Sequence, residues 1–205
     1  GADASAVAVA PGPYAYVANS SGASLSAYGM DASSGALTPV AGSPFAIGAS
    51  PNGLVVDDSG THVYAAESQP NGVAGYSIDS ASGALTAIAG SPFHASYVVS
   101  APVMDGEGKR LHVANGTDVD CFWINSSAGD LSELGLSTTG GKAIALAMDR
   151  TDNFLYVLDN VNNQVEVFSV APTDGSLTLI NGSPFALFSG AASQNLGPNA
   201  IAVAH

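Results

Sequence analysis

The segment GSPF at Gly42–Phe45 recurs at Gly90–Phe93 and again at Gly182–Phe185. The first two copies are 48 residues apart, and the third lies 92 residues further on, about two periods. A turn sequence keeps the same spacing, as DASSGALT from Asp31, DSASGALT from Asp79, NSSAGDLS from Asn125 and APTDGSLT from Ala171. Self-similarity at a period of roughly 40–50 residues indicates a circular or stacked repeat architecture.

The second period shows which strands make up one repeat. Its short apolar runs are Leu54–Val56, His62–Ala66, Gly72–Ile78 and Ala84–Ala89, separated by Gly, Asp and Ser. Such runs between turn residues predict an antiparallel β-meander. No stretch of the chain keeps the 3.6-residue apolar period of an amphipathic helix. Four strands in each unit therefore predict the blade of a β-propeller.

The fold class is all-β, a single β-propeller domain over residues 1–205 built from four-stranded antiparallel blades. We expect blades at about residues 6–45, 51–93, 99–140 and 143–185. Residues 198–204 repeat the inner-strand pattern of Pro51–Asp57 and predict one extra inner strand. The third blade reads STTG at Ser137–Gly140 where GSPF is expected, which predicts a remodelled outer corner.

The blade count leaves three arrangements open. The chain is a piece of a longer propeller, a part of a ring completed by another copy, or a ring closed on four blades with the last strand displaced. We favour the first two, because a lone open arc would leave large apolar blade faces in water.

Aromatic side chains recur at three places in the repeats, and one set, Phe45, Phe93 and Phe185, ends the fourth strand. The second strand carries Tyr16, Tyr64 and Tyr156, with His112 in the third blade, and the third strand carries Tyr28, Tyr76, Phe122 and Phe168. Aromatic residues bury the largest area of any side chain, so we interpret them as wedges between neighbouring blades. A ligand cage is the alternative interpretation.

Strands that read YVAN, the D-x-x-[ST]-G-x-L-T turn and the GSPF ending resemble the YVTN-type β-propeller repeats. These are similar in turn to the lactonase-like seven-bladed propellers, whose relatives include 6-phosphogluconolactonase and carboxymuconate cyclases. The resemblance covers nearly the whole chain and implies lactone hydrolysis by His, Glu and Arg side chains near a central channel. The expected inner strands contain none of these three residue types: Ala6–Ala10, Gly53–Val56, Ala101–Met104, Ile144–Met148 and Ala200–Val203. We therefore assign no catalytic residue and expect no lactonase activity from this chain alone.

The amino-acid composition bears on the binding partners and on the cellular location of the protein. The net charge is −13, from 17 acidic and 4 basic residues, which makes nucleic acid and anionic membrane surfaces poor partners, and we expect no nucleic-acid binding. Only 10% of the residues are charged, and small polar residues predominate instead, as in many secreted proteins. We expect an extracellular or periplasmic location. No apolar stretch approaches the length of a transmembrane span.

Other motifs point to no metal or cofactor. Asp118 and Asp120 do not belong to a complete calcium loop. The four histidines lack the spacing of metal ligands. Cys121 is the single cysteine, so it forms no internal disulfide, and we expect it to be a small buried side chain.

One face of the propeller is the better candidate for binding. It carries the loops between second and third strands and the crossings between blades, which are longer here and richer in Asn and acids. Loops on a rigid scaffold carry binding more often than tight turns do. The candidate binding residues are Asn19, Glu67, Asn115, Asp118, Asp159, Asn160 and Asn163. That these are only solvated loops is the equal alternative.

The sequence thus predicts a binding or interaction module that takes a protein or carbohydrate ligand. Self-association, or pairing with the remainder of a longer propeller, is expected. One alternative is a lactone hydrolase of the 6-phosphogluconolactonase type, or a part of one. Another is a structural protein that assembles through its open blade ends.

Overall fold

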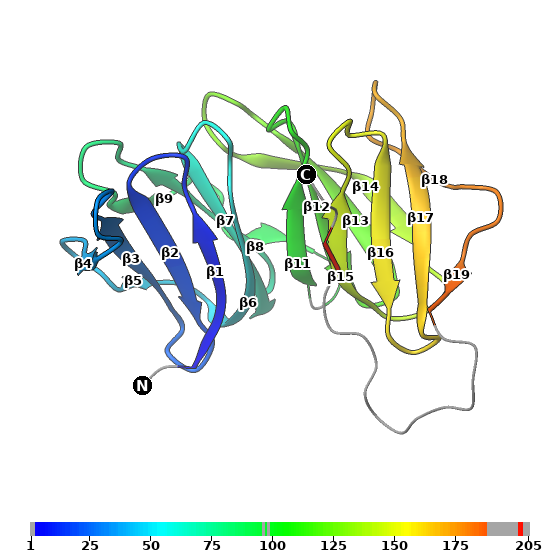
Figure 1. The fold of residues 1–205 in the computed structure, drawn as a ribbon, viewed down its shortest axis with the longest axis horizontal. Coiled ribbons are helices and arrows are strands. Elements are labelled where there is room, and N and C mark those ends of the chain that lie inside the picture. The colour runs from blue at the N-terminus through cyan, green and yellow to red at the C-terminus, as the bar shows by residue number, and fades with distance from the viewer. Residues whose placement is uncertain (1–2, 96, 98, 188–200, 203–205) are drawn as a thin grey trace.

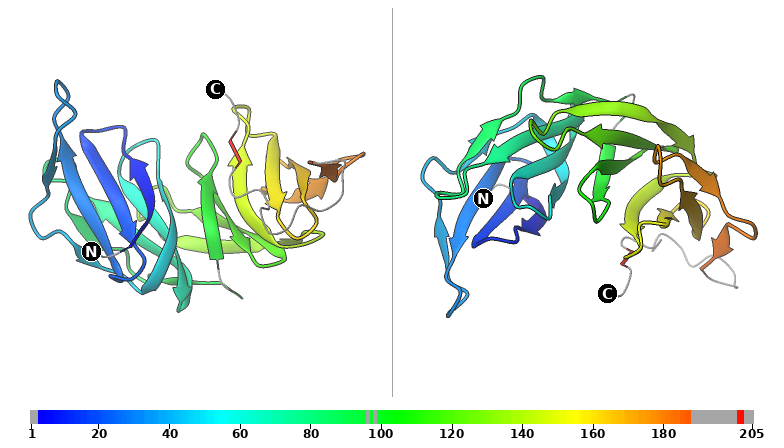
Figure 2. Two further views of the ribbon diagram at one scale, coloured as in Figure 1. Left: turned by 60° about the horizontal axis from the view of Figure 1, so that its bottom comes forward. Right: turned by 90° about the horizontal axis from the view of Figure 1, so that it is seen from above.

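The computed structural model describes residues 3–95, 97, 99–187 and 201–202. These residues form four antiparallel sheets and no helix, which confirms the all-β propeller fold. The sheets stand one after another around an arc, with their first strands on the inner side (Figures 1 and 2). No helix that could cross a membrane occurs in the described ranges.

The strands of each sheet follow one another along the chain, so each sheet is one blade. Blade 1 contains β1 (Ala4–Val9), β2 (Tyr14–Asn19), β3 (Ser24–Met30), β4 (Leu37–Pro39) and β5 (Phe45–Ala46). Blade 2 contains β6 (Ala49–Val56), β7 (His62–Gln69), β8 (Asn71–Ile78), β9 (Leu85–Ala87) and β10 (Phe93–His94). Blade 3 contains β11 (Val99–Met104), β12 (Arg110–Asn115), β13 (Asp118–Ile124) and β14 (Leu131–Thr138). Blade 4 contains β15 (Ala143–Met148), β16 (Phe154–Asp159), β17 (Gln164–Val170), β18 (Leu177–Leu179) and β19 (Phe185–Ala186).

The extra inner strand expected at residues 198–204 lies almost wholly outside the described residues. Of these positions the structure describes Ile201 and Ala202, and it assigns neither to a strand.

The GSPF segment divides the outer strand of three blades into two pieces that pair with the same third strand. Its serine hydroxyl accepts a hydrogen bond from a third-strand backbone N–H at the break. Ser43 Oγ lies 2.9 Å from Ala27 N, and Ser91 and Ser183 repeat the contact with Gly75 and Val167. The hydroxyl therefore accepts a hydrogen bond from a backbone N–H of the third strand that has no backbone partner where the outer strand is interrupted. Blade 3 has no GSPF, and its outer strand β14 runs unbroken over eight residues, so the predicted remodelling is confirmed.

Neighbouring blades are joined by a tyrosine and a turn glycine. Tyr16 Oη donates to the carbonyl of Gly83 in blade 2 at 3.1 Å, and Tyr64 Oη donates to Gly129 in blade 3 at 2.9 Å. Gly83 has φ of 74°, and a Cβ there would lie 2.4 Å from Tyr14 Cδ1. The turn needs glycine both for its left-handed backbone and for the close approach of the preceding blade.

The contact between blades 3 and 4 departs from this pattern. His112 takes the tyrosine position, is fully buried, and has no hydrogen-bond partner for either ring nitrogen among the described residues. Burial lowers the pKa of His112 to about 4, so the ring is neutral at pH 7. Arg110 supplies the polar contact instead, since its Nη2 donates to the Pro172 carbonyl of blade 4.

Both ends of the arc expose apolar side chains whose counterparts in inner blades are buried. Val7 of blade 1 is 67% exposed, whereas Leu54 at the same register position of blade 2 is 9% exposed against blade 1. At the other end, Phe185 of blade 4 is 47% exposed. Its equivalents Phe45 and Phe93 are partly buried against the core clusters. Each end face has the apolar surface that elsewhere meets another blade.

Replacing Phe168 by Ala should lower the free energy of unfolding by about 3–5 kcal/mol, because the ring is 3% exposed in the core between blades 3 and 4. Urea denaturation followed by circular dichroism measures the change. Phe185→Ala is the matched control and should cost less than about 1 kcal/mol, because that residue is already about half exposed. Equal losses in the two variants would contradict the proposed packing.

Replacing His112 by Tyr should make the protein more resistant to acid. The pKa of His112 is lowered from 6.5 to about 4, so the parent loses stability as pH falls between these values. The loss is roughly 3 kcal/mol when the whole window is crossed. Tyrosine does not titrate there, and it is the residue that blades 1, 2 and 4 carry at this position. Melting temperatures from pH 7 to pH 4 should fall less steeply for the variant, and parallel curves would refute this account.

Candidate functional site

Four of the predicted binding residues occupy one equivalent position, the last residues of the second strands. Asn19, Asn115 and Asp159 end β2, β12 and β16, and Glu67 lies near the end of β7. All four are buried. We call this end of the blades the loop side, since the second strand connects to the third there, and the opposite end the turn side.

The hydrogen bonds of these residues run to the protein itself. Glu67 Oε1 accepts from Gly48 N at 2.8 Å, and Asp159 Oδ1 accepts from Lys142 N at 3.1 Å. Gly48 and Lys142 belong to the crossings that enter blades 2 and 4. A Cβ on Gly48 would lie 2.3 Å from the Glu67 carboxylate, so this contact requires glycine. The buried acids therefore hold each crossing against its blade.

In blades 1 and 3 the same position pairs with the third strand. Asn19 Nδ2 donates to Ser26 Oγ at 2.9 Å, and Asn115 Nδ2 donates to Asp120 Oδ2 at 2.8 Å. Burial raises the pKa of Asp120. Burial also raises the pKa of Glu67, in spite of its bond from Gly48.

The other three predicted residues differ in exposure. Asp118 is buried at the start of β13, Asn160 is partly buried, and Asn163 is exposed with φ of 51°. Five of the seven candidates thus point into the protein, and a role in binding stays a prediction for all seven. Sequence reasoning missed Glu166, which accepts from Gly140 N at 2.7 Å in blade 4. Glu166 has the same register position as Ser26 and Asp120 in blades 1 and 3. Alignment of the repeats could therefore have identified it as a polar residue beside the strand-end position.

A hollow of about 850 Å³ lies on the loop side, where three blades meet. The beginnings of the inner strands of blades 2, 3 and 4 contribute Asn52, Ser100 and Ala143, and nearby loops contribute Asn71, Thr117, Tyr97 and Lys142. Asn52 Oδ1 is buried without a partner among the described residues. Amides, hydroxyls and one ammonium group suit a polyhydroxylated anion.

A second hollow of about 400 Å³ lies at the turn side of the same inner strands. Val55, Met104 and Met148 form the apolar part of its lining, and Arg150 lines it together with Asp58, Asp105, Asp149 and Asp152. One of these, Asp152, accepts from Gly106 N at 2.9 Å and so links blades 3 and 4.

The two hollows hold the two unpaired cations of the described residues. Lys109 pairs with Glu107 at 2.8 Å, and Arg110 lies 3.6 Å from Asp105. Lys142 lines the loop-side hollow and Arg150 the turn-side hollow, and neither forms an ion pair within the described ranges. No cluster of three or more His, Cys, Asp or Glu side chains suited to a metal ion occurs in that part of the chain.

Comparison with known proteins relates this architecture to lactonase propellers. A family model described as lactonase, 7-bladed beta-propeller matches residues 1–104. Among curated proteins, none matches the chain significantly.

Solved structures with the same fold include two putative 6-phosphogluconolactonases. The one from Bacteroides fragilis has a TM-score of 0.79 at 18% identity, over 88% of this chain and 54% of that one. The one from Bacteroides uniformis has a TM-score of 0.76 at 17% identity, again over 88% and 54%. The periplasmic gluconolactonase of Pseudomonas aeruginosa has a TM-score of 0.69 at 18% identity, over 89% and 55%. The chain thus spans about half the length of these proteins, and such identities show a common fold.

Replacing Glu67 by Gln should change how stability depends on pH. Because the pKa of Glu67 is raised above 4.5, the parent loses stability as pH rises from about 4.5 through that raised value. Glutamine keeps an acceptor for Gly48 N and does not titrate. The free energy of unfolding of the variant, relative to the parent, should therefore increase from pH 4 to pH 8 in urea titrations. Glu107→Gln, at an exposed pair, is the control and should show little trend; a flat difference for Glu67→Gln would refute the prediction.

Proposed function

Because the chain belongs to the lactonase family of seven-bladed β-propellers, we propose that it forms part of a lactone-processing ring whose loop-side hollow binds the sugar-acid portion of the ligand. The observation that carries the proposal is the convergence of three inner strands on an 850 Å³ hollow lined by Lys142, which forms no ion pair with any described residue. Pockets of 300–1,000 Å³ are typical of small-molecule sites.

The chemistry of the lining favours a gluconolactone or its phosphorylated form. Related structures are described as a gluconolactonase and as putative 6-phosphogluconolactonases. The hydroxyl groups of such a ligand match the side chains of Asn52, Asn71 and Thr117. A phosphate or carboxylate would pair with Lys142. In a protein of net charge −13, an anionic ligand depends on such a local cation.

Hydrolysis needs a titratable group within hydrogen-bond reach of the attacking water. The described inner strands β1, β6, β11 and β15 contain no charged residue. We infer that this chain supplies binding groups and that further blades supply the base. Two observations support the division: the chain spans about half the length of the related structures, and both of its end faces expose apolar side chains. Those blades come from a longer parent chain or from a second copy.

A pure binding module for a carbohydrate or a protein is the second candidate. The lack of charged residues on the described inner strands favours it, since binding needs no base. Under either function we place the protein in the periplasm or outside the cell, in line with its small polar surface residues and with the periplasmic relative.

Replacing Lys142 by Gln should weaken the binding of 6-phosphogluconate, the hydrolysis product, by roughly tenfold, because a charge-assisted hydrogen bond is lost. Isothermal titration calorimetry on the purified chain measures this directly. In the same preparation, gluconolactone should open no faster than in buffer.

Arg150→Gln is the matched control, since it removes the other unpaired cation on the turn side. It should leave the affinity unchanged. Loss of binding in Arg150→Gln alone would show that the ligand binds on the turn side and would refute the proposed site in the loop-side hollow. Clear lactone turnover by the chain alone would refute the inference that further blades supply the catalytic base.

A further inference from the structure

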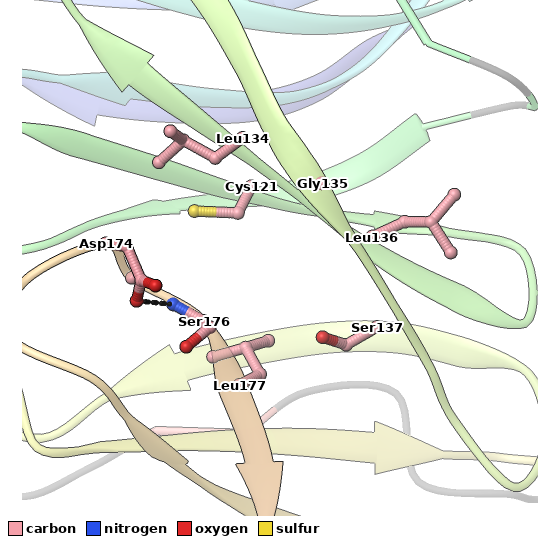
Figure 3. Close-up of a pocket in the computed structure, with 9 residues that line it drawn as sticks. Cys121, Leu134, Gly135, Leu136, Ser137, Asp174, Ser176 and Leu177 are labelled. Atoms are coloured by element: carbon pink, nitrogen blue, oxygen red, sulfur yellow. Dashed lines mark hydrogen bonds between the residues drawn. The ribbon is translucent and has the colours of Figure 1, made fainter.

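A third pocket, of about 310 Å³, lies between blades 3 and 4, away from both hollows of the inner strands. Figure 3 shows it between β13 and β14 on one side and the turn that leads into β18 on the other. We call it the blade 3–4 pocket. Its lining includes Cys121, Leu134, Gly135, Ser137, Asp174 and Leu177.

Comparison of the repeats explains why the space is open. Ser137 pairs with Val119, at the register position where Phe45, Phe93 and Phe185 pair in the other blades. Gly135 pairs with Cys121, where the other blades place Val40, Ile88 and Ile180. Blade 3 therefore lacks two apolar side chains, a phenyl ring and an aliphatic group, at adjoining places.

Blade 2 shows what normally fills this position. Its counterpart of Cys121 is Gly75, since the two pair with His112 and Tyr64 respectively. A Cβ on Gly75 would lie 3.1 Å from Phe93 Cε2 and 3.2 Å from Ile88 Cδ1. The phenyl ring and the isoleucine thus cover the third strand in blade 2, and in blade 3 the same surface lines a pocket.

The rim of the pocket carries one negative charge. Asp174 accepts a hydrogen bond from Ser176 N at 3.0 Å, drawn in Figure 3, and this bond lowers the pKa of the carboxyl. The carboxylate is therefore ionised at pH 7. Arg110, which also helps to lower the pKa of Asp174, lies 3.6 Å from Asp105 and donates to the Pro172 carbonyl. The hydroxyl of Ser137 adds a second polar group to the lining.

We propose that the blade 3–4 pocket binds a compact aromatic ligand that bears a cationic nitrogen, an arylalkylammonium. The ring takes the place that Phe93 holds in blade 2, and the ammonium group pairs with Asp174. A single ring suits the volume, since an apolar cavity of about 150 Å³ already accepts benzene. This site is separate from the loop-side hollow, and the inference does not depend on the proposed function.

The probe is phenethylammonium, titrated into the purified chain by calorimetry and by saturation-transfer NMR. We expect a dissociation constant of about 1 mM or tighter, as for a ligand of this size. Butylammonium has the charge without the ring and phenylacetate has the ring with the opposite charge, and both should bind at least about tenfold more weakly. Equal binding of all three, or no binding of phenethylammonium, would overturn the proposal.

Two variants test the position of the ligand. Ser137→Phe restores the ring of the other blades, and should abolish binding while the melting temperature stays equal or rises. Asp174→Asn should weaken phenethylammonium by about fivefold and leave benzyl alcohol unchanged, because only the charge is removed. Ser132→Phe, on the same strand but outside the pocket, is the matched control and should bind like the parent. If Ser137→Phe is unstable, Asp174→Asn still decides: an unchanged affinity would place the ligand elsewhere and refute the site.

Discussion

Every blade of this protein must bury both of its faces, and the contact that achieves this is repeated along the chain. A third-strand aromatic residue packs against the preceding blade, as Tyr76 and Phe122 do, while a second-strand tyrosine donates to a turn glycine of the following blade. The turn glycine allows the close approach of the preceding blade at this contact. The short fourth strand and the GSPF segment form the outer edge of the same blades. Because no blade can satisfy both faces alone, the surface exposed by Val7 and Phe185 at the ends of the arc is a direct result of the same geometry.

The polar residues of the loop side serve the scaffold and the hollow together. Asp159 holds the backbone of Lys142, and Lys142 lines the loop-side hollow. A buried carboxylate thus holds the backbone of the residue whose side chain we assign to ligand binding. Asp159 accepts from backbone N–H groups and from the side-chain amides of Asn162 and Gln164, so this acid is engaged with neutral donors while the exposed Lys142 side chain lines the hollow.

Much of the fold could be predicted from the sequence, because the repeats mark strands and turns at a constant spacing. The division of the outer strand around GSPF could not, since the hydroxyl of Ser43 replaces a strand partner only in three dimensions. The acids at the strand ends were interpreted as loop residues because they adjoin Asn- and Gly-rich segments. The structure covers Glu67 with the crossing chain at Gly48, a contact between residues 19 positions apart that no local pattern reveals. The sequence shows that STTG replaces GSPF in blade 3. It does not show that Gly135 replaces an aliphatic residue of the other blades, because this equivalence depends on the pairing of Gly135 with Cys121.

The unbroken strand β14 has a further consequence for how the protein behaves in a crowded solution. Proline and a loop interrupt the outer edge of the other three blades, whereas β14 presents an eight-residue edge without proline. Such an edge is a template on which a strand of another molecule can add, and native sheets discourage this with charges and bulges. Glu133 lies exposed on β14, and the ladder is irregular at the adjoining Cys121 and Phe122. Gly135, which opens the blade 3–4 pocket, lies at this irregularity, so the departure of blade 3 from the repeat also supplies a bulge of the kind by which native sheets discourage such pairing.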